Sequence, residues 1–407
     1  MKMCLQWISQ DSVGTGLRRI CLDPIFHDDI SIVYYNNVSL APTRRTMTPA
    51  RLRLALVIVV IARWFADLDP SPADNNHLIV ERSDQSLPSY SLIFVKNFTM
   101  VVPVIDFSKL DGAERAETMA QIADGCENWG FFQLVNHGIP LELLDRVKKV
   151  CSESYRLREA AFRSSEPVQT LERLVEAERR GEAVAPVDDM DWEDIFYLHD
   201  DNQWPSDPPA FKETMREYRA ELKKLAERVM EAMDENLGLD KGRMKAAFTG
   251  DGLHAPFFGT KVSHYPPCPR PDLITGLRAH TDAGGVILLF QDDKVGGLEV
   301  LKDGEWLDVQ PLPDAIVVNT GDQVEVLSNG RYRSAWHRVL PMRNGNRRSI
   351  ASFYNPAFEA AISPAVGEGA AAAYPDYVFG DYMDVYNKQK FDAKEPRFEA
   401  VKAPKSA

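Results

Sequence analysis

The chain reads LRAHTDAGG from Leu277 to Gly285 and SAWHRV from Ser334 to Val339. Residues i and i+2 of a strand, or of the loop that leaves it, point to the same side, so His280 and Asp282 can share one metal ion. A third ligand must then come from another strand, and His337 is the candidate. Two neutral imidazoles and one carboxylate hold a divalent iron on one face and leave the opposite positions open for substrate and O2. An isolated HxD pair is more often a surface loop, so the surrounding sequence has to decide.

Beyond Gly250 the sequence has the pattern of β-structure. Short runs rich in Val, Ile and Leu are separated by turns of Gly, Pro, Asp and Asn. We predict strands at 286–290, 298–301, 306–309, 315–319, 323–327 and 349–354, with hairpin turns at 302–305 and 328–330. Strands this short and evenly spaced are typical of a sandwich or double-stranded barrel, which would bring His280 and His337 together across strands.

The segments on either side of this β-region are expected to be partly helical. An apolar stripe at 3-4 spacing predicts a long helix from Phe211 to Leu237, closed by Gly238. The charged stretch 163–186 predicts a solvated helix or a mobile loop. Further predicted elements are strands at 101–107 and 130–136 and helices at 113–128 and 377–390.

These elements predict a mainly β fold with flanking α-structure, in which a double-stranded β-helix (jelly-roll) core carries N-terminal helices and a C-terminal helix. We expect an N-terminal helical and strand region at 100–250 that packs on the core. The iron-binding jelly roll would occupy 251–356 and a helical tail 357–407. Residues 1–99 have no sustained periodicity and stay unassigned, either as an artefact of gene prediction, which we favour, or as an added disordered segment.

Composition restricts the partners and the compartment. A net charge of −13 and a pI near 5.2 argue against nucleic acid or an anionic membrane as the natural partner. The apolar run 54–62 has nine residues, too few to span a bilayer, which takes about 20. The five cysteines are scattered and form no CxxC pair, which suits a reducing, cytoplasmic location.

A basic residue and a hydroxyl follow the second histidine by one strand. Arg347 and Ser349 stand at i and i+2, so both can point into the barrel that holds the metal. A guanidinium with a hydroxyl is suited to binding a carboxylate. Tyr265 begins a rigid turn, YPPCP, and could equally be a packed turn residue or part of the pocket.

Together, HxD, a histidine 55 residues after the aspartate, RxS and YPPCP resemble the plant iron(II)/2-oxoglutarate-dependent oxygenases. Within that superfamily the chain resembles the 1-aminocyclopropane-1-carboxylate oxidases, which form ethylene. The resemblance runs from about Met100 to Lys402. Its most specific strings are CENWGFF (126–132), GLRAHTDAGG (276–285), LLFQDDKV (288–295), SIASFYNP (349–356) and KEPRFEA (394–400).

The resemblance implies a soluble, monomeric enzyme that converts 1-aminocyclopropane-1-carboxylate and O2 to ethylene, CO2 and cyanide. It implies iron(II) as the metal, ascorbate (vitamin C) as co-substrate and bicarbonate or CO2 as activator. By matching motifs, it assigns iron ligands to His280, Asp282 and His337, catalytic and anion-binding roles to Lys261, Arg278, Arg347, Ser349 and Arg397, and pocket positions to Tyr265, Phe353 and Gln291.

The chain departs from the family pattern at several positions. Ala357 stands where a glycine is usual, His264 where an asparagine is usual, and the segment 367–373 is short and alanine-rich. Two alternatives remain open. A 2-oxoglutarate-dependent hydroxylase or desaturase of a plant hormone or flavonoid would use the same triad, and a cupin-like binding protein would keep the fold without turnover.

Overall fold

The computed structural model describes residues 3–11, 14–22, 76–83, 89–96, 100–365 and 371–402. The chain divides into two compact units, Met1–Met100 and Val101–Ala407. In the first unit the described strands form a sheet in the order β2-β1-β4-β3, with β1 at Met3–Asp11, β2 at Gly14–Leu22, β3 at Asn76–Ser83 and β4 at Ser89–Lys96. The apolar run 54–62 lies outside the described residues, and the two interpretations of residues 1–99 stay predictions.

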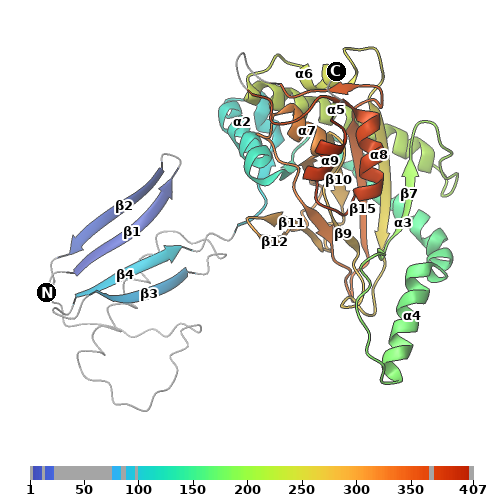
Figure 1. Ribbon diagram of the computed structural model, residues 1–407, viewed down its shortest axis with the longest axis horizontal. Coiled ribbons are helices and arrows are strands. Elements are labelled where there is room, and N and C mark those ends of the chain that lie inside the picture. The colour runs from blue at the N-terminus through green and yellow to red at the C-terminus, as the bar shows by residue number, and fades with distance from the viewer. Residues whose placement is uncertain are drawn as a thin grey trace. The chain divides into compact units, whose positions relative to one another are not determined.

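The second unit is built on two sheets and is drawn from cyan to red in Figure 1. The larger sheet has the order β5-β6-β13-β10-β15-β8-β7 and the smaller one β12-β11-β14-β9. The strands of the larger sheet are β5 Val104–Asp106, β6 Phe131–Val135, β7 Asp194–Leu198, β8 Phe257–Tyr265, β10 Val286–Gln291, β13 Ile316–Thr320 and β15 Arg347–Asn355. Those of the smaller sheet are β9 Leu277–His280, β11 Leu298–Lys302, β12 Glu305–Asp308 and β14 His337–Val339. The predicted jelly-roll core is confirmed.

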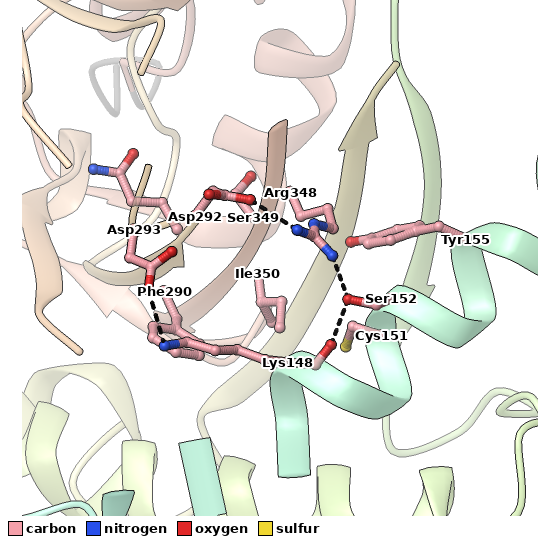
Figure 2. Close-up of a pocket in the computed structure, with 11 residues that line it drawn as sticks. Lys148, Cys151, Ser152, Tyr155, Phe290, Asp292, Asp293, Arg348, Ser349 and Ile350 are labelled. Atoms are coloured by element: carbon pink, nitrogen blue, oxygen red, sulfur yellow. Dashed lines mark hydrogen bonds and ion pairs between the residues drawn. The ribbon is translucent and has the colours of Figure 1, made fainter. Parts of the chain in front are cut away.

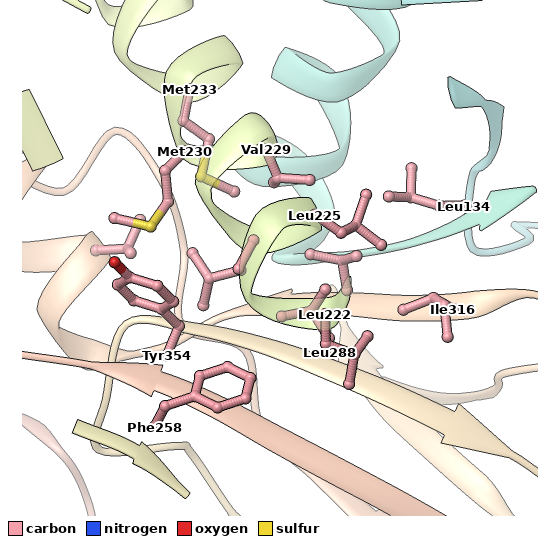
Figure 3. Close-up of a cluster of buried hydrophobic side chains, with 14 of the residues drawn as sticks. Leu134, Leu222, Leu225, Val229, Met230, Met233, Phe258, Leu288, Ile316 and Tyr354 are labelled. Atoms are coloured by element: carbon pink, nitrogen blue, oxygen red, sulfur yellow. The ribbon is translucent and has the colours of Figure 1, made fainter. Parts of the chain in front are cut away.

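Helices cover one face of the larger sheet. The predicted long helix is α5, Phe211–Leu237, and Gly238 ends it with a left-handed φ of 73° that only glycine adopts without strain. Its apolar stripe, including Leu222, Leu225 and Val229, packs against strand residues of the sheet (Figure 3). The other helices are α2 Arg115–Asp124, α3 Leu141–Arg163, α4 Glu166–Arg179, α6 Arg243–Phe248, α8 Phe379–Gln389 and α9 Glu395–Ala400. Short turns of helix, η1 Phe107–Asp111 and η2 Gly125–Trp129, and a two-residue pair, β16 Ala361–Ile362 with β17 Tyr377–Val378, complete the unit.

Alternation along β15 separates the two faces of the larger sheet. Ile350 and Tyr354 belong to the core under the helices, whereas Arg347, Ser349 and Phe353 line a cavity on the other face. This is the period-2 pattern of a strand with two covered faces. The predicted direction of Arg347 and Ser349 is therefore confirmed.

The hairpin predicted at 302–305 is confirmed. Lys302 pairs with Glu305 across the ends of β11 and β12, and the two turn residues both have positive φ, 51° at Asp303 and 89° at Gly304. Positive φ at both turn residues is typical of the tight hairpin turn that an Asp-Gly sequence favours.

One predicted strand is wrong. Residues 323–327 are helical, within α7, Asp322–Leu327, and the segment 328–330 ends that helix instead of closing a hairpin. The sequence of residues 323–327, QVEVL, alternates polar and apolar side chains as a strand does, but every residue of α7 is buried in the structure, including Gln323 and Glu325. A short buried run of this kind can be either a strand or a helix, and its sequence does not distinguish them.

The remaining predictions for the flanking segments agree with the helices observed. The charged stretch 163–186 contains α4, in which Leu171 is buried, and the tail helix predicted at 377–390 is α8. Strands β5, β6 and β7 of the region 100–250 belong to the same sheet as the core strands. No helix among the described residues is both long and apolar enough to cross a lipid bilayer.

Candidate metal centre and its cavity

The candidate metal ligands converge at one end of the smaller sheet. His280 ends β9 and His337 begins β14, and the two are direct cross-strand partners. Asp282 follows two residues after His280, beyond the end of the strand. The distances from Nε2 of His280 and of His337 to the carboxylate oxygens of Asp282 are both 3.5 Å. All three residues are buried, and one ligand atom from each lies within 4.8 Å of the others, so the cluster has the size of a single-metal site.

Backbone hydrogen bonds orient both imidazoles. Nδ1 of His280 lies 2.8 Å from the carbonyl oxygen of Arg278, and Nδ1 of His337 lies 3.1 Å from that of Ala335. A carbonyl can only accept, so each Nδ1 carries the proton and each Nε2 presents its lone pair to the cluster. Burial, with the nearby charges of His337 and Lys390, lowers the pKa of His280 to about 3, which keeps this imidazole neutral and able to bind a metal.

The carboxylate is held in its ionised form. Burial alone would raise the pKa of Asp282, but positive charge on the neighbouring imidazoles, when these are protonated, and the hydrogen bond from Asn319 outweigh this effect and lower it. Nδ2 of Asn319 also donates to Oδ2 of Asp282 at 2.9 Å, which fixes the carboxylate. Two neutral imidazoles and one oriented carboxylate fit iron(II) with open coordination positions.

The cluster opens into a cavity of about 620 Å³ between the two sheets, within the size range of small-molecule sites. Its walls include side chains from both sheets and from α8. Of the residues singled out in the sequence, eight line it: His280, Asp282, His337, Lys261, Arg347, Ser349, Tyr265 and Phe353. The residues that do not line it are Arg278, Gln291 and Arg397.

Arg347 is a buried cation without a counter-charge in the described part of the chain. Its side chain is 1% exposed, and no carboxylate of the described residues lies within the 4.0 Å of an ion pair. Nη1 donates to Ser349 at 3.2 Å, Nη2 donates to Gln291 at 2.9 Å, and Nε has no partner. Burial lowers the pKa of Arg347, because a desolvated charge is costly. An anion in the cavity would relieve that cost, so Arg347 is a candidate for an anion-binding position.

Three other predicted cations each face a carboxylate instead. The pairs are Lys261 with Glu193 at 2.8 Å, Arg278 with Asp191 at 3.1 Å, and Arg397 with Asp322 at 3.5 Å. The family resemblance implied that all three cations bind anions. Their carboxylate partners could not be predicted, because an acid distant in sequence leaves no local signal.

Arg397 lies behind the metal ligands. It is fully buried on α9, and Nη2 donates to Oγ1 of Thr281 at 2.8 Å. Thr281 stands between the two ligands of the HxD motif. The structure therefore places Arg397 where it can position the ligands, outside the lining of the cavity.

Two residues that the sequence reasoning missed contribute to the site. Asn319 fixes Asp282, and Lys390 lines the cavity just after α8. Neither belongs to a short motif. By contrast, His264, a departure from the family pattern, bonds to Asn346 and stacks on Tyr155 outside the cavity.

A second, smaller cavity lies between α3 and strands β10 and β15 (Figure 2). It measures about 80 Å³, and its charges are already paired. Lys148 pairs with Asp293 at 3.6 Å, and Arg348 pairs with Asp292 at 3.2 Å and donates to Ser152. With no group of metal ligands in its walls, it offers no chemistry comparable to the larger cavity.

Comparison with known proteins agrees with this architecture. The profile of the 2OG-Fe(II) oxygenase superfamily matches residues 258–356, and that of the non-haem dioxygenase in morphine synthesis N-terminal region matches residues 102–220. Among solved structures, that of JOX2 in complex with 2OG, Fe, and JA is 35% identical, with a TM-score of 0.60, and covers 75% of this chain and 90% of JOX2.

The jelly roll and its buried His–Asp–His cluster define a non-haem iron oxidoreductase of this superfamily. Two curated relatives narrow the assignment. The 1-aminocyclopropane-1-carboxylate oxidase of Musa acuminata is 71% identical over 309 residues, which are 75% of this chain and 100% of the relative. 1-Aminocyclopropane-1-carboxylate oxidase 5 of Arabidopsis thaliana is 64% identical over 313 residues, with the same coverage. The chain belongs to the 1-aminocyclopropane-1-carboxylate oxidase family.

Proposed function

We propose that this protein is an iron(II)- and ascorbate-dependent oxidase that converts 1-aminocyclopropane-1-carboxylate and O2 to ethylene, CO2 and cyanide. The observation that carries the proposal is the uncompensated guanidinium of Arg347 in the same cavity as the His–Asp–His cluster. The relatives named above, up to 71% identical, support the choice of substrate.

The proposed ligands of the metal are His280, Asp282 and His337. When bound on one face by these groups, iron(II) supplies open positions at which the amino acid and O2 can meet. The protein's own contribution is to turn Nε2 of both histidines toward the metal position, through the two backbone carbonyls that accept from Nδ1, and to hold the carboxylate by Asn319.

Arg347 and Ser349 are proposed to bind an anion, either bicarbonate as activator or a carboxylate of a reactant. The guanidinium is planar and already fixed by Gln291, so little freedom is lost when it binds. Tyr265, whose ring lies 5.2 Å from the Arg347 guanidinium, and Phe353 would close the walls around it.

Ascorbate is proposed as the reductant. The reaction balances when ascorbate gives two electrons and two protons, because O2 then ends as two molecules of water beside ethylene, CO2 and HCN. A cavity of about 620 Å³ exceeds what a four-carbon amino acid needs, which leaves room for a second small molecule.

Roles for Lys261, Arg278 and Arg397 remain predictions. Lys261 faces the cavity and could contact an anion only together with Glu193, its carboxylate partner. Arg278 is held by Asp191 and packs on Phe391, with its guanidinium 3.8 Å from the ring centre.

We further propose a cytoplasmic monomer that binds neither nucleic acid nor membrane. The negative net charge of −13 supports this, as do the cysteines of the described core, Cys126, Cys151 and Cys268, which are buried and unpaired.

The second candidate is a 2-oxoglutarate-dependent hydroxylase. It is favoured by the RxS pair and by the likeness to JOX2, whose structure contains 2OG. In that case Arg347 and Ser349 would bind the far carboxylate of 2-oxoglutarate.

The test is gas chromatography of headspace ethylene above the purified protein with iron(II), ascorbate, bicarbonate and 1-aminocyclopropane-1-carboxylate. Each component is omitted in turn, and Asp282→Ala prepared in parallel is the control. We expect ethylene that depends on all four components and is absent with the variant. Ethylene production that is equal in the Asp282→Ala control, or none from the complete mixture, would contradict the proposal.

A further inference from the structure

The basic side chains around the cavity differ in whether an acid faces them. Arg347 and Lys390 both line the cavity, and within the described part of the chain neither has a carboxylate at ion-pair distance. Lys261 also lines the cavity, but its ammonium group is occupied by Glu193. Glu193 itself is not among the residues that line the cavity.

Glu193 lies in an extended segment that leads into β7. Asp191 and Glu193 stand at i and i+2 in this segment and form ion pairs with Arg278 and Lys261, respectively. Trp192, between them, is buried on the opposite side. Its backbone N–H donates to Thr275 at 2.8 Å and its indole N–H donates to the carbonyl of Pro266 at 2.9 Å. These hydrogen bonds fix the segment, so the positions of the two carboxylates do not depend on a flexible surface loop.

The contact between Glu193 and Lys261 is two-pronged. Nζ of Lys261 donates to Oε1 at 2.8 Å and to Oε2 at 2.9 Å, and the two side chains are 9% and 10% exposed. At such low exposure, Coulomb attraction is only weakly screened, so the pair presents almost no net charge to the cavity.

A second lysine, Lys390, lines the same cavity as Lys261. Burial lowers the pKa of Lys390, and the positive charge of Lys261 lowers it further. Two ammonium groups in one cavity, if both were unpaired, would form a binding site for a dianion such as sulfate or phosphate. A singly charged anion such as bicarbonate or ascorbate needs only one of them.

We propose that Glu193 is a specificity-determining residue that neutralises Lys261 and so prevents Lys261 and Lys390 from binding an inorganic dianion together. Glu193 acts as a built-in counter-anion at Lys261. Arg347 and Lys390 then remain for singly charged co-substrates. The inference rests on the proposed function only in naming these co-substrates.

The test measures the binding of inorganic sulfate by calorimetry, at constant ionic strength, to the full chain loaded with iron(II) without O2. In Glu193→Gln we expect sulfate to bind at least fivefold more tightly than in the unchanged protein. Glu193→Asp, which keeps the charge, should stay within twofold. The double variant Glu193→Gln/Lys261→Met, which removes both charges, should return to the original affinity.

Glu178→Gln is the matched control. It removes one negative charge from a partly exposed carboxylate that pairs with Arg270, neither of which lines the cavity, and should leave sulfate binding within twofold. Unchanged sulfate affinity in Glu193→Gln, or a gain that persists in the double variant, would overturn the proposal.

Glu193→Gln leaves a buried lysine unpaired and could fail to fold, which circular dichroism would reveal. In that case the double variant alone tests the proposal, through its bicarbonate binding, because Lys261 is already neutralised in the unchanged protein. It should bind bicarbonate within twofold of the original affinity, and a loss greater than fivefold would show that Lys261 serves directly as an anion ligand. Sulfate binding requires no turnover, so absence of ethylene would count against the proposed function alone.

Discussion

Replacement of Arg397 by methionine should reduce stability and leave the affinity for ascorbate and bicarbonate unchanged. The guanidinium is fully buried beneath the HxD motif. It donates to Thr281 at 2.8 Å and lies 3.5 Å from Oδ2 of Asp322. Asp322 is also fully buried and accepts a hydrogen bond from Tyr382 at 2.6 Å. Methionine fills much of the volume but leaves Asp322 without its cation.

The expected loss follows from the burial of this pair. Removal of one partner from a buried ion pair costs about 3–5 kcal/mol, because the remaining charge has no compensation. Tyr382 still donates to Asp322, so the lower end, about 3 kcal/mol, is expected. For a unit that spans Val101–Ala407, this corresponds to a fall in Tm of roughly 6 °C.

Thermal unfolding by circular dichroism, together with KM values for ascorbate and bicarbonate, provides the assay. Arg331→Met is the matched control. Arg331 forms a 2.7 Å pair with Glu127 in which the side chains are 48% and 31% exposed. An exposed pair of this kind contributes at most about 1 kcal/mol, so Tm should fall by roughly 2 °C or less. An unchanged Tm in Arg397→Met, with KM for either anion raised tenfold, would refute the reasoning and return Arg397 to the anion-binding role that the family resemblance implied.

Three further predictions concern the metal, the anion and the N-terminal segment. Asp282→Ala and His337→Ala should each lose iron-dependent turnover and bind less than one tenth of an equivalent of iron by metal analysis. Substantial turnover with either variant would show that the three residues do not form the metal site. Arg347→Lys keeps the charge but loses the planar two-pronged contact, so the bicarbonate concentration needed for half-maximal activity should rise about tenfold while iron content stays constant. A change in iron content alone would contradict this. Deletion of residues 1–99 should leave turnover and the unfolding temperature within error, since the second compact unit, Val101–Ala407, contains the whole lining of the cavity. Loss of soluble expression or a tenfold fall in turnover would show that the segment packs on the core.

The strands and the convergence of the triad could be predicted because their signals are local. His280 and Asp282 stand two apart, which puts them on one side of an extended chain, and the period-2 pattern around Arg347 gave its direction correctly. The stripe of α5 and the closing Gly238 are equally local signals. Each depends on a few neighbouring residues and needs no knowledge of the tertiary fold.

Charge pairing could not be predicted in this way. Glu193 lies 68 positions before Lys261, and Asp322 lies 75 positions before Arg397 (397 − 322). No residue close to Lys261 or Arg397 in the sequence therefore indicates which acid will be its partner. The helix α7 was missed for a different reason: its residues 323–327, QVEVL, alternate polar and apolar side chains, which is the pattern of a strand, and the tertiary fold overrides it. Motifs identify the basic residues, but the tertiary fold determines which of them have no carboxylate partner and can bind an anion in the cavity.

Ethylene and succinate measured in the same sealed reaction distinguish the proposed oxidase from a 2-oxoglutarate-dependent hydroxylase. The purified chain is supplied with iron(II), ascorbate, bicarbonate, 1-aminocyclopropane-1-carboxylate and 2-oxoglutarate, and Asp282→Ala is run in parallel. We expect ethylene from the unchanged protein and succinate no higher than in the variant. Succinate released in step with consumption of an organic substrate, without ethylene, would contradict this expectation and assign the cavity to a 2-oxoglutarate-dependent hydroxylase.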